Sequence, residues 1–374
     1  MVSLHLWGSY GKIAINSIVM VTLQIGDKMI NENPFTITFG KRPNRLISRY
    51  EDSDKIISTF TADNPVSQTF LIEGIRGSGK TVLMTTVSKQ LEDDKNWIVV
   101  NLNPTMDLLS NLAIRLADEC DNKPQILSKG FNVSAAGFGI GVNPDGAMTD
   151  YVGSIEKSFK SIIKKKKRVL ITIDEVVHDN NMKVFASQFQ IFVRQDYPIF
   201  LLMTGLQNNI SDIQNDPSLT FLLRAPKIIT GALSTLQIRR QYQEIFDIDD
   251  NTAGELAGFT KGYAFGFQAF GVCYWENRDQ GMDKVLAKFD ELLDDYVYKK
   301  IWSDLTAKER DIVLAIQGEE EKVGVICSKA NISNGTFSKY KEKMMAAGII
   351  EATKYGYVSL ILPRFYEVVR NYQV

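Results

Sequence analysis

Cysteine and histidine are scarce in this sequence. Among 374 residues only three are cysteine and two are histidine. Cys120, Cys273 and Cys327 are far apart and odd in number, which excludes a disulfide framework and a CxxC metal site. With only His5 and His178, sites built on several histidines are excluded too. We therefore expect a protein of a reducing compartment, the cytoplasm, without a cysteine-bound or histidine-bound metal.

The sequence also lacks an excess of either charge and a long hydrophobic run. Lys and Arg number 43 against 44 Asp and Glu, so coating of nucleic acid by bulk charge is excluded. The early apolar stretch 13–26 is shorter than the about 20 residues of a membrane span, and no signal-peptide cleavage site follows it. We expect no membrane partner. Residues 1–32 are interpreted as an N-terminal extension, which is either β-rich or precedes a true start at Met20 or Met29.

Ordinary hydrophobic content, 44%, and a charged fraction of 23% predict a globular protein of two or three domains. Apolar strand-like segments alternate with helix-like segments, which predicts an α/β fold with a parallel sheet and helices on both faces. The predicted strands are 69–74, 96–103, 168–174, 197–205 and 227–233, and the predicted helices between them are 80–93, 106–120 and 184–195.

Three domains follow from this pattern. Residues 33–235 form the α/β domain, and we expect a β-hairpin insertion near 130–142, where apolar residues alternate with small or polar ones. Residues 236–300 have apolar spacing typical of helices and predict a small helical lid. Residues 301–374 then form a third domain.

A glycine-rich segment, GIRGSGKT at 74–81, fits GxxxxGK[ST] directly after a predicted strand and before a predicted helix. This Walker A pattern wraps ATP phosphates with backbone N–H groups. Lys80 is expected to reach the β- and γ-phosphates, and the Thr81 hydroxyl to bind Mg²⁺. The expected nucleotide contacts are Gly74, Ile75, Arg76, Gly77, Ser78, Gly79, Lys80, Thr81 and Val82.

A second motif, VLITIDE at 169–175, is a hydrophobic strand that ends in two acids. Asp174 would lie at the carboxyl end of the strand, where open α/β sheets bind ligands, and would hold Mg²⁺. Glu175 is suited to orient or deprotonate the attacking water. The alternative is that the acidic pair only caps the next helix.

Two further residues are candidates for catalysis. Thr204 ends the strand 200–205 and would face the γ-phosphate if that strand lies between the other two; otherwise it belongs to a strand-ending turn. Arg224 would stabilise phosphate charge in this subunit or in a neighbouring one, or it forms a surface salt bridge.

Together these motifs resemble the AAA+-like ATPases of the archaeal ATPase, Orc1/Cdc6-like and STAND group, over about residues 33–300. The opening 33–60 is similar to that group's nucleotide-recognition segment, and Arg49 falls where a family arginine precedes the first helix. The resemblance implies a sensor strand between the two Walker strands, with Thr204 in place of the usual Asn.

The segment FTKGYAFGFQ at 259–268 resembles the TxGYPxxxQ motif of the group's lid helices, with Ala264 in place of the proline. No sensor-2 arginine is evident before the end of the lid. This departure favours the STAND or archaeal ATPase side over a standard AAA+ machine.

The C-terminal segment resembles a winged helix-turn-helix. Predicted helices at 305–318, 323–330 and 336–347 are followed by Gly348 and a β-hairpin. If it binds double-stranded DNA, Thr336, Lys339, Lys341 and Lys343 are the expected contacts. Ten basic and nine acidic side chains in 301–374 give a balance of +1, so a protein partner or a homo-oligomer stays open as the alternative. The basic run 164–168 is interpreted as a solvated helix end.

The sequence thus predicts a Mg²⁺-dependent ATPase whose nucleotide state controls a winged-helix domain acting on DNA or a protein. Two alternatives remain. One is a slow or non-hydrolysing nucleotide switch in a protein assembly. The other is a DNA-binding regulator with a structural nucleotide site.

Overall fold

The structure is a computed structural model that describes residues 32–38, 43, 45–120 and 150–373. The extension 1–31, with its alternative starts, and the hairpin expected near 130–142 lie outside the described residues. Within the part of the chain that is described, no helix is long and apolar enough to span a membrane.

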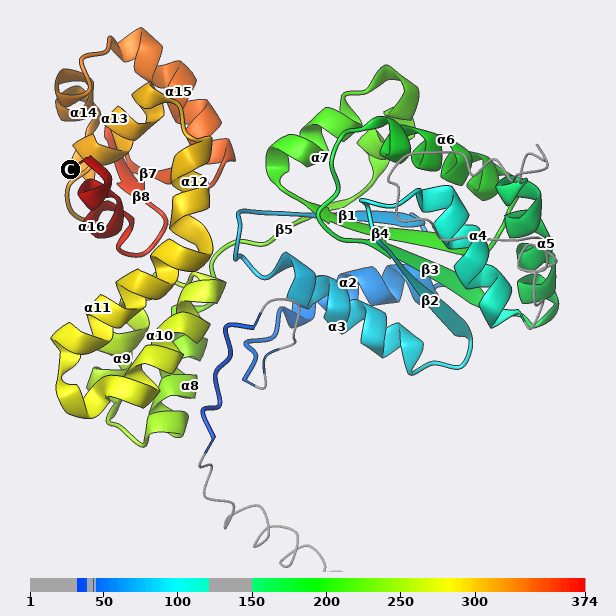
Figure 1. The fold of residues 1–374 in the computed structure, drawn as a ribbon, viewed down its shortest axis with the longest axis horizontal. Helices are drawn as coiled ribbons and strands as arrows, with labels where there is room; N and C mark the ends of the chain where they lie inside the picture. Colours follow the sequence, from blue (N-terminus) through cyan, green and yellow to red (C-terminus); the bar gives the residue numbers. More distant parts are fainter. Residues whose placement is uncertain (1–31, 39–42, 44, 121–149, 374) are drawn as a thin grey trace, which may run out of the picture.

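A five-stranded parallel sheet forms the centre of the N-terminal half (Figure 1). Its order is β2-β3-β4-β1-β5, so β4 lies between β1 and β3, as the resemblance implied. The strands are β1 (Thr69–Glu73), β2 (Trp97–Leu102), β3 (Arg168–Ile173), β4 (Ile199–Gly205) and β5 (Lys227–Ile229). The last strand is shorter than the predicted 227–233, because the Gly231 N–H bonds back to the Ile229 carbonyl and turns the chain.

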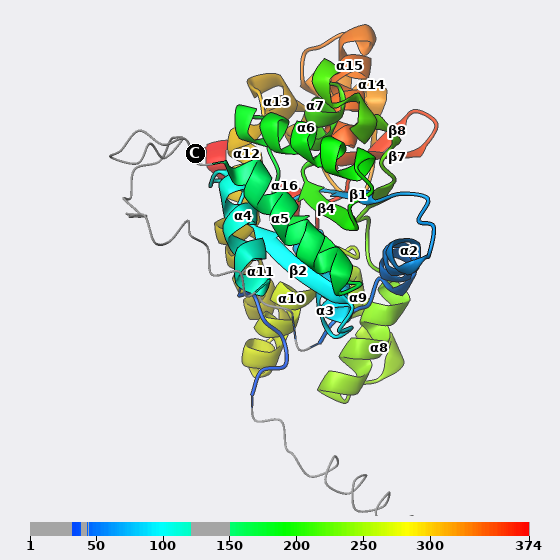
Figure 2. The same ribbon diagram turned by 90° about the vertical axis from the view of Figure 1, so that its right-hand side faces the viewer.

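Helices cover both faces of this sheet, which parallel sheets require because both of their faces are apolar. Leu71 and Leu201 point to one face, whereas Phe70 and Phe200 point to the other. The first face packs on α4 (Leu108–Glu119), α5 (Tyr151–Lys164) and α6 (Asn180–Arg194), and the second on α2 (Tyr50–Thr61) and α3 (Lys80–Glu92). Figure 2 shows α4 and α5 in front of the sheet. The expected α/β fold is confirmed.

Two elements between β4 and β5 were not predicted. They are α7 (Gln207–Gln214) and the 3-10 helix η1 (Pro217–Arg224). The Asp216 side chain caps η1 by accepting from the Ser218 N–H. Both elements pack against the same face of the sheet as α6.

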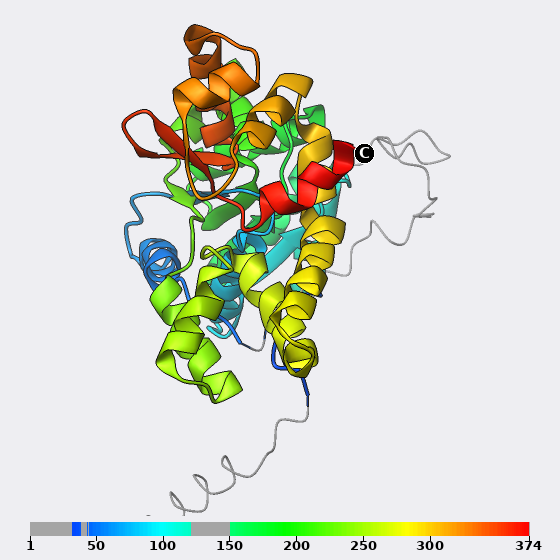
Figure 3. The same ribbon diagram turned by 90° about the vertical axis from the view of Figure 1, so that its left-hand side faces the viewer.

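The helical region that follows contains α8 (Thr235–Phe246), α9 (Asp250–Gly258), α10 (Ala264–Asn277), η2 (Arg278–Gln280) and α11 (Met282–Leu293). The chain then continues without a break through a π-helical turn, η3 (Asp294–Tyr298), into α12 (Lys299–Asp304). Figure 3 shows this run as one column. The predicted boundary at residue 300 therefore lies inside a helix, and the division into domains stays a prediction.

Small helices and a three-stranded antiparallel sheet, ordered β6-β8-β7, form the C-terminal region and fit a winged helix. The elements are α13 (Ala307–Ala315), β6 (Glu321–Lys322), α14 (Val323–Lys329), α15 (Asn334–Ala346), β7 (Ile350–Lys354), β8 (Tyr357–Leu360), α16 (Phe365–Val369) and η4 (Arg370–Gln373). The expected start of the third helix at Thr336 is too late. The Ser333 hydroxyl accepts from the Thr336 N–H and thereby caps a helix that begins at Asn334.

The helices α8–α12 and the C-terminal region share one hydrophobic core. The N-terminal segment joins it through Phe35, which is 4% exposed and packs among the rings of Tyr242, Phe246 and Phe267. Gly271 on α10 makes room for this ring, since a Cβ there would overlap it. Residues 32–38 are thus anchored on α10 rather than on the sheet.

Candidate nucleotide site

The glycine-rich loop 74–81 connects β1 to α3, and the side chain of Lys80, near its end, bonds to carbonyl groups at its start. Gly77 and Gly79 have φ angles of +70° and +92°, which favour glycine, and Gly79 is the N-cap of α3. The Lys80 ammonium donates to the carbonyl oxygens of Gly74 at 3.1 Å and Ile75 at 2.8 Å. The cation therefore lies across the loop at the N-terminus of a helix, where an anion binds.

Lys80 is only 7% exposed. Burial lowers the pKa of its ammonium from 10.5 to about 8, although the nearby carboxylates of Glu175 and Asp174 partly oppose this shift. The loop thus holds a poorly solvated positive charge, which a phosphate group would stabilise.

Hydrogen bonds join the ends of β3 and β4 to the start of α3. Asp174 Oδ2 accepts from the Thr81 hydroxyl at 2.8 Å, and Asp174 Oδ1 accepts from the Thr204 hydroxyl. The Thr204 oxygen in turn accepts from the Glu175 N–H at 3.1 Å. Three segments that are distant in sequence meet here, at Thr81, at Asp174 and Glu175, and at Thr204, which is completely buried.

Glu175 is exposed and has a φ of +55°, an unusual backbone conformation for a residue with a Cβ. Two bonds on either side of it fix this conformation: its own N–H donates to Thr204, and the Val176 N–H donates to the Thr204 carbonyl at 2.8 Å. Backbone strain of this kind is found at functional sites and costs about 1–3 kcal/mol. It turns the Glu175 carboxylate toward the cavity described below.

Arg49, at the start of α2, reaches the same loop. Its guanidinium donates to the carbonyl oxygens of Ser78, at 3.2 Å, and of Gly231. Burial lowers the pKa of Arg49, and the charge of Asp52 opposes that shift. The Ser78 hydroxyl also lies 2.6 Å from the hydroxyl of Thr230, a contact that links the loop to the end of β5.

The loop is covered by residues of the 259–268 motif. The Tyr263 hydroxyl donates to the Arg76 carbonyl at 2.7 Å, and the Phe265 N–H donates to the Gly77 carbonyl at 3.0 Å. A Cβ on Gly77 would overlap the Tyr263 hydroxyl. The start of α10 is therefore in direct contact with the loop.

A cavity of about 270 Å³ lies between these parts. Arg76 to Val82, Arg49 and Glu175 line one part of it, whereas Gly74, Ile75, Asp174 and Thr204 do not. The other lining residues are both apolar and polar: Thr36, Ile37, Thr38, Pro43, Leu46, Ile47, Ser48, Ser53, Leu83, Thr85, Thr86, Leu233, Ala264, Phe265, Phe267, Gln268, Tyr296 and Val297.

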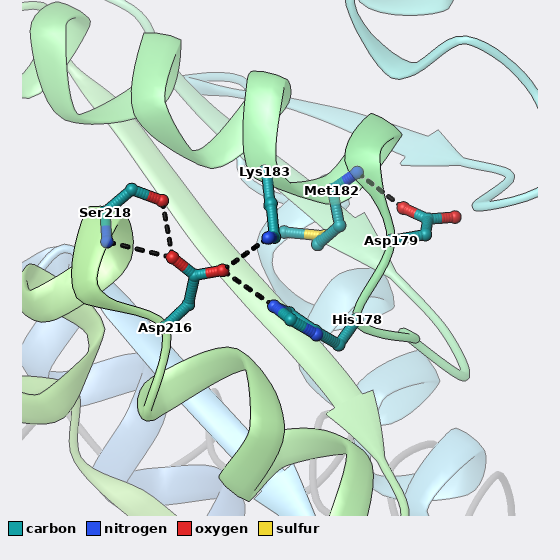
Figure 4. A network of polar contacts seen from close by, with 6 residues as sticks. All are labelled: His178, Asp179, Met182, Lys183, Asp216 and Ser218. Atoms are coloured by element: carbon teal, nitrogen blue, oxygen red, sulfur yellow. Dashed lines mark hydrogen bonds and ion pairs between the residues drawn. The ribbon is translucent and has the colours of Figure 1, made fainter.

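Arg224 is not brought to this cavity. It is exposed at the end of η1, and it forms no ion pair with any residue that the structure describes. A buried carboxylate fixes the start of η1: Asp216 accepts from Lys183 at 2.8 Å and from Ser218, and contacts His178 Nε2 at 2.7 Å (Figure 4). Lys183, then Ser218 and His178, hold the pKa of Asp216 far below its ordinary value. The network joins the segment after Glu175 to the helix that carries Arg224.

The candidate DNA contacts all lie on α15, in different surroundings. Thr336 and Lys339 are exposed, and Lys341 is half-buried. Lys343 forms an ion pair of 2.7 Å with Glu309, which is only 2% exposed. Its charge is therefore already compensated within the chain.

The sequence did not point to Thr230 or to the network around Asp216, and it contained Gln268 only as the last residue of the 259–268 motif. The hydroxyl of Thr230 follows β5 directly, at the same edge of the sheet as the glycine-rich loop, and this position was the available signal. Asp216 stands before Pro217 and Ser218, a pattern typical of a capped helix start. Nothing in the sequence pairs it with His178.

Comparisons with known proteins agree with the fold. The Aeropyrum pernix ORC2 protein, solved as ADPNP-ADP complexes, has a TM-score of 0.58 and 13% identity, over 89% of this chain and 96% of that chain. Cdc6p from Pyrobaculum aerophilum has a TM-score of 0.48 at 13% identity, with the same coverages. At this identity the likeness shows the fold alone, and the second score is too low to carry an argument. The first confirms the expected fold, a parallel α/β sheet with helices on both faces that is followed by a helical region and a small C-terminal sheet.

Sequence comparisons add one match. A family model described as a domain of unknown function (DUF8462) matches residues 295–369. These residues run from the π-helical turn to the end of α16. A search of curated proteins finds no match.

Proposed function

We propose that this chain binds ATP with Mg²⁺ and hydrolyses it. The observation that carries the proposal is the chain of hydrogen bonds from Thr81 through Asp174 and Thr204 to Glu175, which ends beside the buried Lys80. A loop that only shaped the fold would need neither a buried ammonium nor a strained glutamate next to it. The likeness in fold to a protein solved with ADPNP and ADP supports a nucleotide as the ligand.

Each residue has a role that its position supports. Loop N–H groups from Arg76 to Thr81 bind phosphate oxygens, and Lys80 leaves the loop carbonyls to neutralise the transferred phosphate. Glu175 accepts a proton from the attacking water, because its carboxylate is exposed and held at the cavity. Thr204 orients Asp174 and the Glu175 backbone. Arg49 fixes the Ser78 carbonyl and thereby the loop.

The residues present also fit Mg²⁺, which prefers oxygen ligands. Thr81 and Asp174 place a hydroxyl and a carboxylate 2.8 Å apart at the end of the loop, and these two would hold the ion. When bound, Mg²⁺ neutralises charge on the phosphates.

Arg224 has no contact with its own cavity, so we assign it to a neighbouring subunit's phosphates in an assembly of this chain. Its position at the tip of an exposed helix that Asp216 fixes supports this assignment. The alternative is an ordinary surface arginine.

Nucleotide state would act on the C-terminal region through a direct contact. Ile75 of the glycine-rich loop packs so closely on Gly348, directly after α15, that a Cβ at Gly348 would overlap it. If Lys80 turns to a phosphate, the loop carbonyls it leaves would move. Through the contact between Ile75 and Gly348, this movement would shift the end of α15. The exposed N-terminal half of that helix would act on double-stranded DNA or on a protein partner.

Two substitutions test the proposal. Lys80→Ala should abolish ATP binding, whereas Glu175→Gln should keep binding and lose turnover. Lys89→Ala and Glu92→Gln are matched controls, because both residues are exposed on α3 and outside the cavity. Equal hydrolysis by wild type and Glu175→Gln would exclude the catalytic role. If wild type binds ATP without turnover, the chain is a nucleotide switch; if Lys80→Ala still binds DNA as wild type does, the nucleotide site does not control that activity.

A further inference from the structure

One buried amide on α10 holds the N-terminal segment at two places. Gln268 Oε1 accepts from the Thr36 N–H at 3.0 Å, and Gln268 Nε2 donates to the Arg45 carbonyl at 2.7 Å. The residue is only 7% exposed. A single side chain thus binds backbone groups at two positions of the N-terminal segment, Thr36 and Arg45.

Few side chains can replace this amide. A carboxylate accepts but does not donate, and an apolar side chain does neither. A backbone N–H or C=O that loses its hydrogen-bond partner on folding destabilises the protein. The Thr36 N–H and the Arg45 C=O therefore both depend on the Gln268 side chain.

These backbone groups shape one wall of the candidate nucleotide cavity. Thr36, Ile37, Leu46 and Ile47 line it from the N-terminal segment, and Gln268 lines it from α10. The neighbouring Phe35 is locked against Gly271 on the same helix. Within the described part of the chain, Thr36, Ile37, Leu46, Ile47 and Gln268 form no hydrogen bond with the loop 74–81, which Arg49 and Tyr263 support instead.

We infer that Gln268 is a positioning residue for the base of the bound nucleotide. It fixes Thr36 and Arg45 against α10, so that the neighbouring side chains of Ile37, Leu46 and Ile47 meet the base in one arrangement. The inference rests on the proposed nucleotide binding and deepens it. It assigns base recognition to α10, whose first turn also contacts the glycine-rich loop through the bond from the Phe265 N–H to the Gly77 carbonyl. The same helix would therefore support both base binding and phosphate binding.

Gln268→Glu is the sharpest substitution, because it keeps the size and the acceptor, removes the donor to Arg45 and adds one negative charge. Titrations with ATP and with inorganic tripolyphosphate separate the two ends of the cavity. We expect ATP to bind about tenfold more weakly, the loss of about one hydrogen bond, and tripolyphosphate to bind as to wild type. Gln280→Glu, the same change at an exposed position of the same region, should leave both affinities unchanged.

Equal weakening of both ligands would overturn the inference, because it would mean general damage to the site. Unchanged ATP affinity would overturn it as well. If wild type binds neither ligand, the proposed function itself fails, which is a different result. Should Gln268→Glu not fold, Gln268→Met removes both the donor and the acceptor without adding a charge, and it should again weaken ATP and leave tripolyphosphate unchanged.

Hydrogen exchange of the wild-type chain tests the inference without any substitution. ATP, and not tripolyphosphate, should slow exchange of amides in 35–38. If ATP leaves exchange there unchanged, this wall does not meet the base and the inference is wrong.

Discussion

The two ends of the cavity are built in different ways. The proposed phosphate end is lined by one continuous segment, 76–82, and by Glu175, whereas Asp174 and Thr204 support it from the carboxyl ends of neighbouring parallel strands without lining the cavity. The base end is assembled from the N-terminal segment, from Leu233, from α10 and from the π-helical turn at 294–298. Only tertiary packing brings these four parts together.

We expect the phosphate end to determine the strength of binding and the reaction, and the base end to determine which nucleotide is preferred. Phosphate binding needs N–H groups and a cation at fixed spacing, which a short motif on a strand and a helix supplies. Base binding needs a wall of the right shape, and in the proposed site that wall depends on how α10 packs against the described residues 32–38 and 45–49. We therefore expect substitutions at the phosphate end to abolish binding and those at the base end to alter preference.

Gly77→Ala should have the largest effect, because Gly77 lies where the two ends meet. Its φ of +70° is strained for alanine, and the added methyl would overlap the buried Tyr263 hydroxyl and lie 2.9 Å from Phe265 Cβ. The start of α10 must move, so both ends lose their geometry. We expect at least about a hundredfold loss of ATP affinity, two steps of about 1.4 kcal/mol each, measured by titration calorimetry.

Gly318→Ala is the matched control for Gly77→Ala. Gly318 has a φ of +108°, and nothing lies within 4 Å of a Cβ built there. This variant carries backbone strain without a clash and should keep ATP affinity while its melting temperature falls. Equal ATP affinity in Gly77→Ala and wild type would show that the contact with Tyr263 is not needed for binding.

The same difference explains what the sequence could predict. The pattern of the loop 74–81 between a predicted strand and a predicted helix identifies the loop, and the end of a hydrophobic strand identifies Asp174. The position of the Thr204 strand between the other two was implied only by the resemblance. Gln268 was visible only as part of a resemblance, since its two backbone partners lie over 220 positions away and backbone groups carry no sequence signal. The helix α15 was predicted, but its start was misjudged because Asn334 and Gly335 are typical of turns.

A moderate effect is expected for the number of protons that the protein takes up when a ligand binds, because Lys80 lies at the phosphate end of the cavity and not at the base end. The pKa of Lys80 is about 8 in the free protein, and a bound triphosphate would raise it. At pH 8.5 about a quarter of the ammonium groups carry their proton before binding, so Mg²⁺-ATP should take up about 0.7 proton, against about 0.1 at pH 7. Calorimetry in buffers of different ionisation enthalpy measures this number.

Adenosine is the control ligand for this measurement, because it occupies the base end and lacks phosphates, and it should take up no proton at either pH. Uptake that does not change with pH would contradict the assignment of Lys80. The same pKa shift affects stability. Between pH 8 and pH 10.5 the unfolded chain keeps a proton on Lys80 that the folded protein has lost, so the free energy of unfolding of the free protein should rise with pH in this range.

The smallest expected effect concerns α15, which lies outside the cavity but touches the loop through Gly348 and Ile75. If this helix binds duplex DNA, Lys339→Ala should reduce the slope of log K against log salt by about 0.9, the loss of one phosphate contact. Lys343→Ala should change the slope less, because Lys343 already neutralises the buried Glu309 at 2.7 Å. It should instead lower the melting temperature, since the Glu309 carboxylate would lose its cation.

Fluorescence anisotropy at several salt concentrations, with and without ATP, measures these slopes. Lys308→Ala is a control, because it removes a half-buried lysine from α13, in the same region but outside α15. An unchanged slope in Lys339→Ala would show that α15 does not contact DNA phosphates, and the exposed half of the helix would then be a surface for a protein partner. A slope that falls equally in Lys339→Ala and Lys343→Ala would mean that DNA breaks the pair with Glu309. In that case binding would cost the C-terminal region part of its stability, and ATP, acting through Ile75 on the end of the same helix, would change DNA affinity without touching any of its lysines.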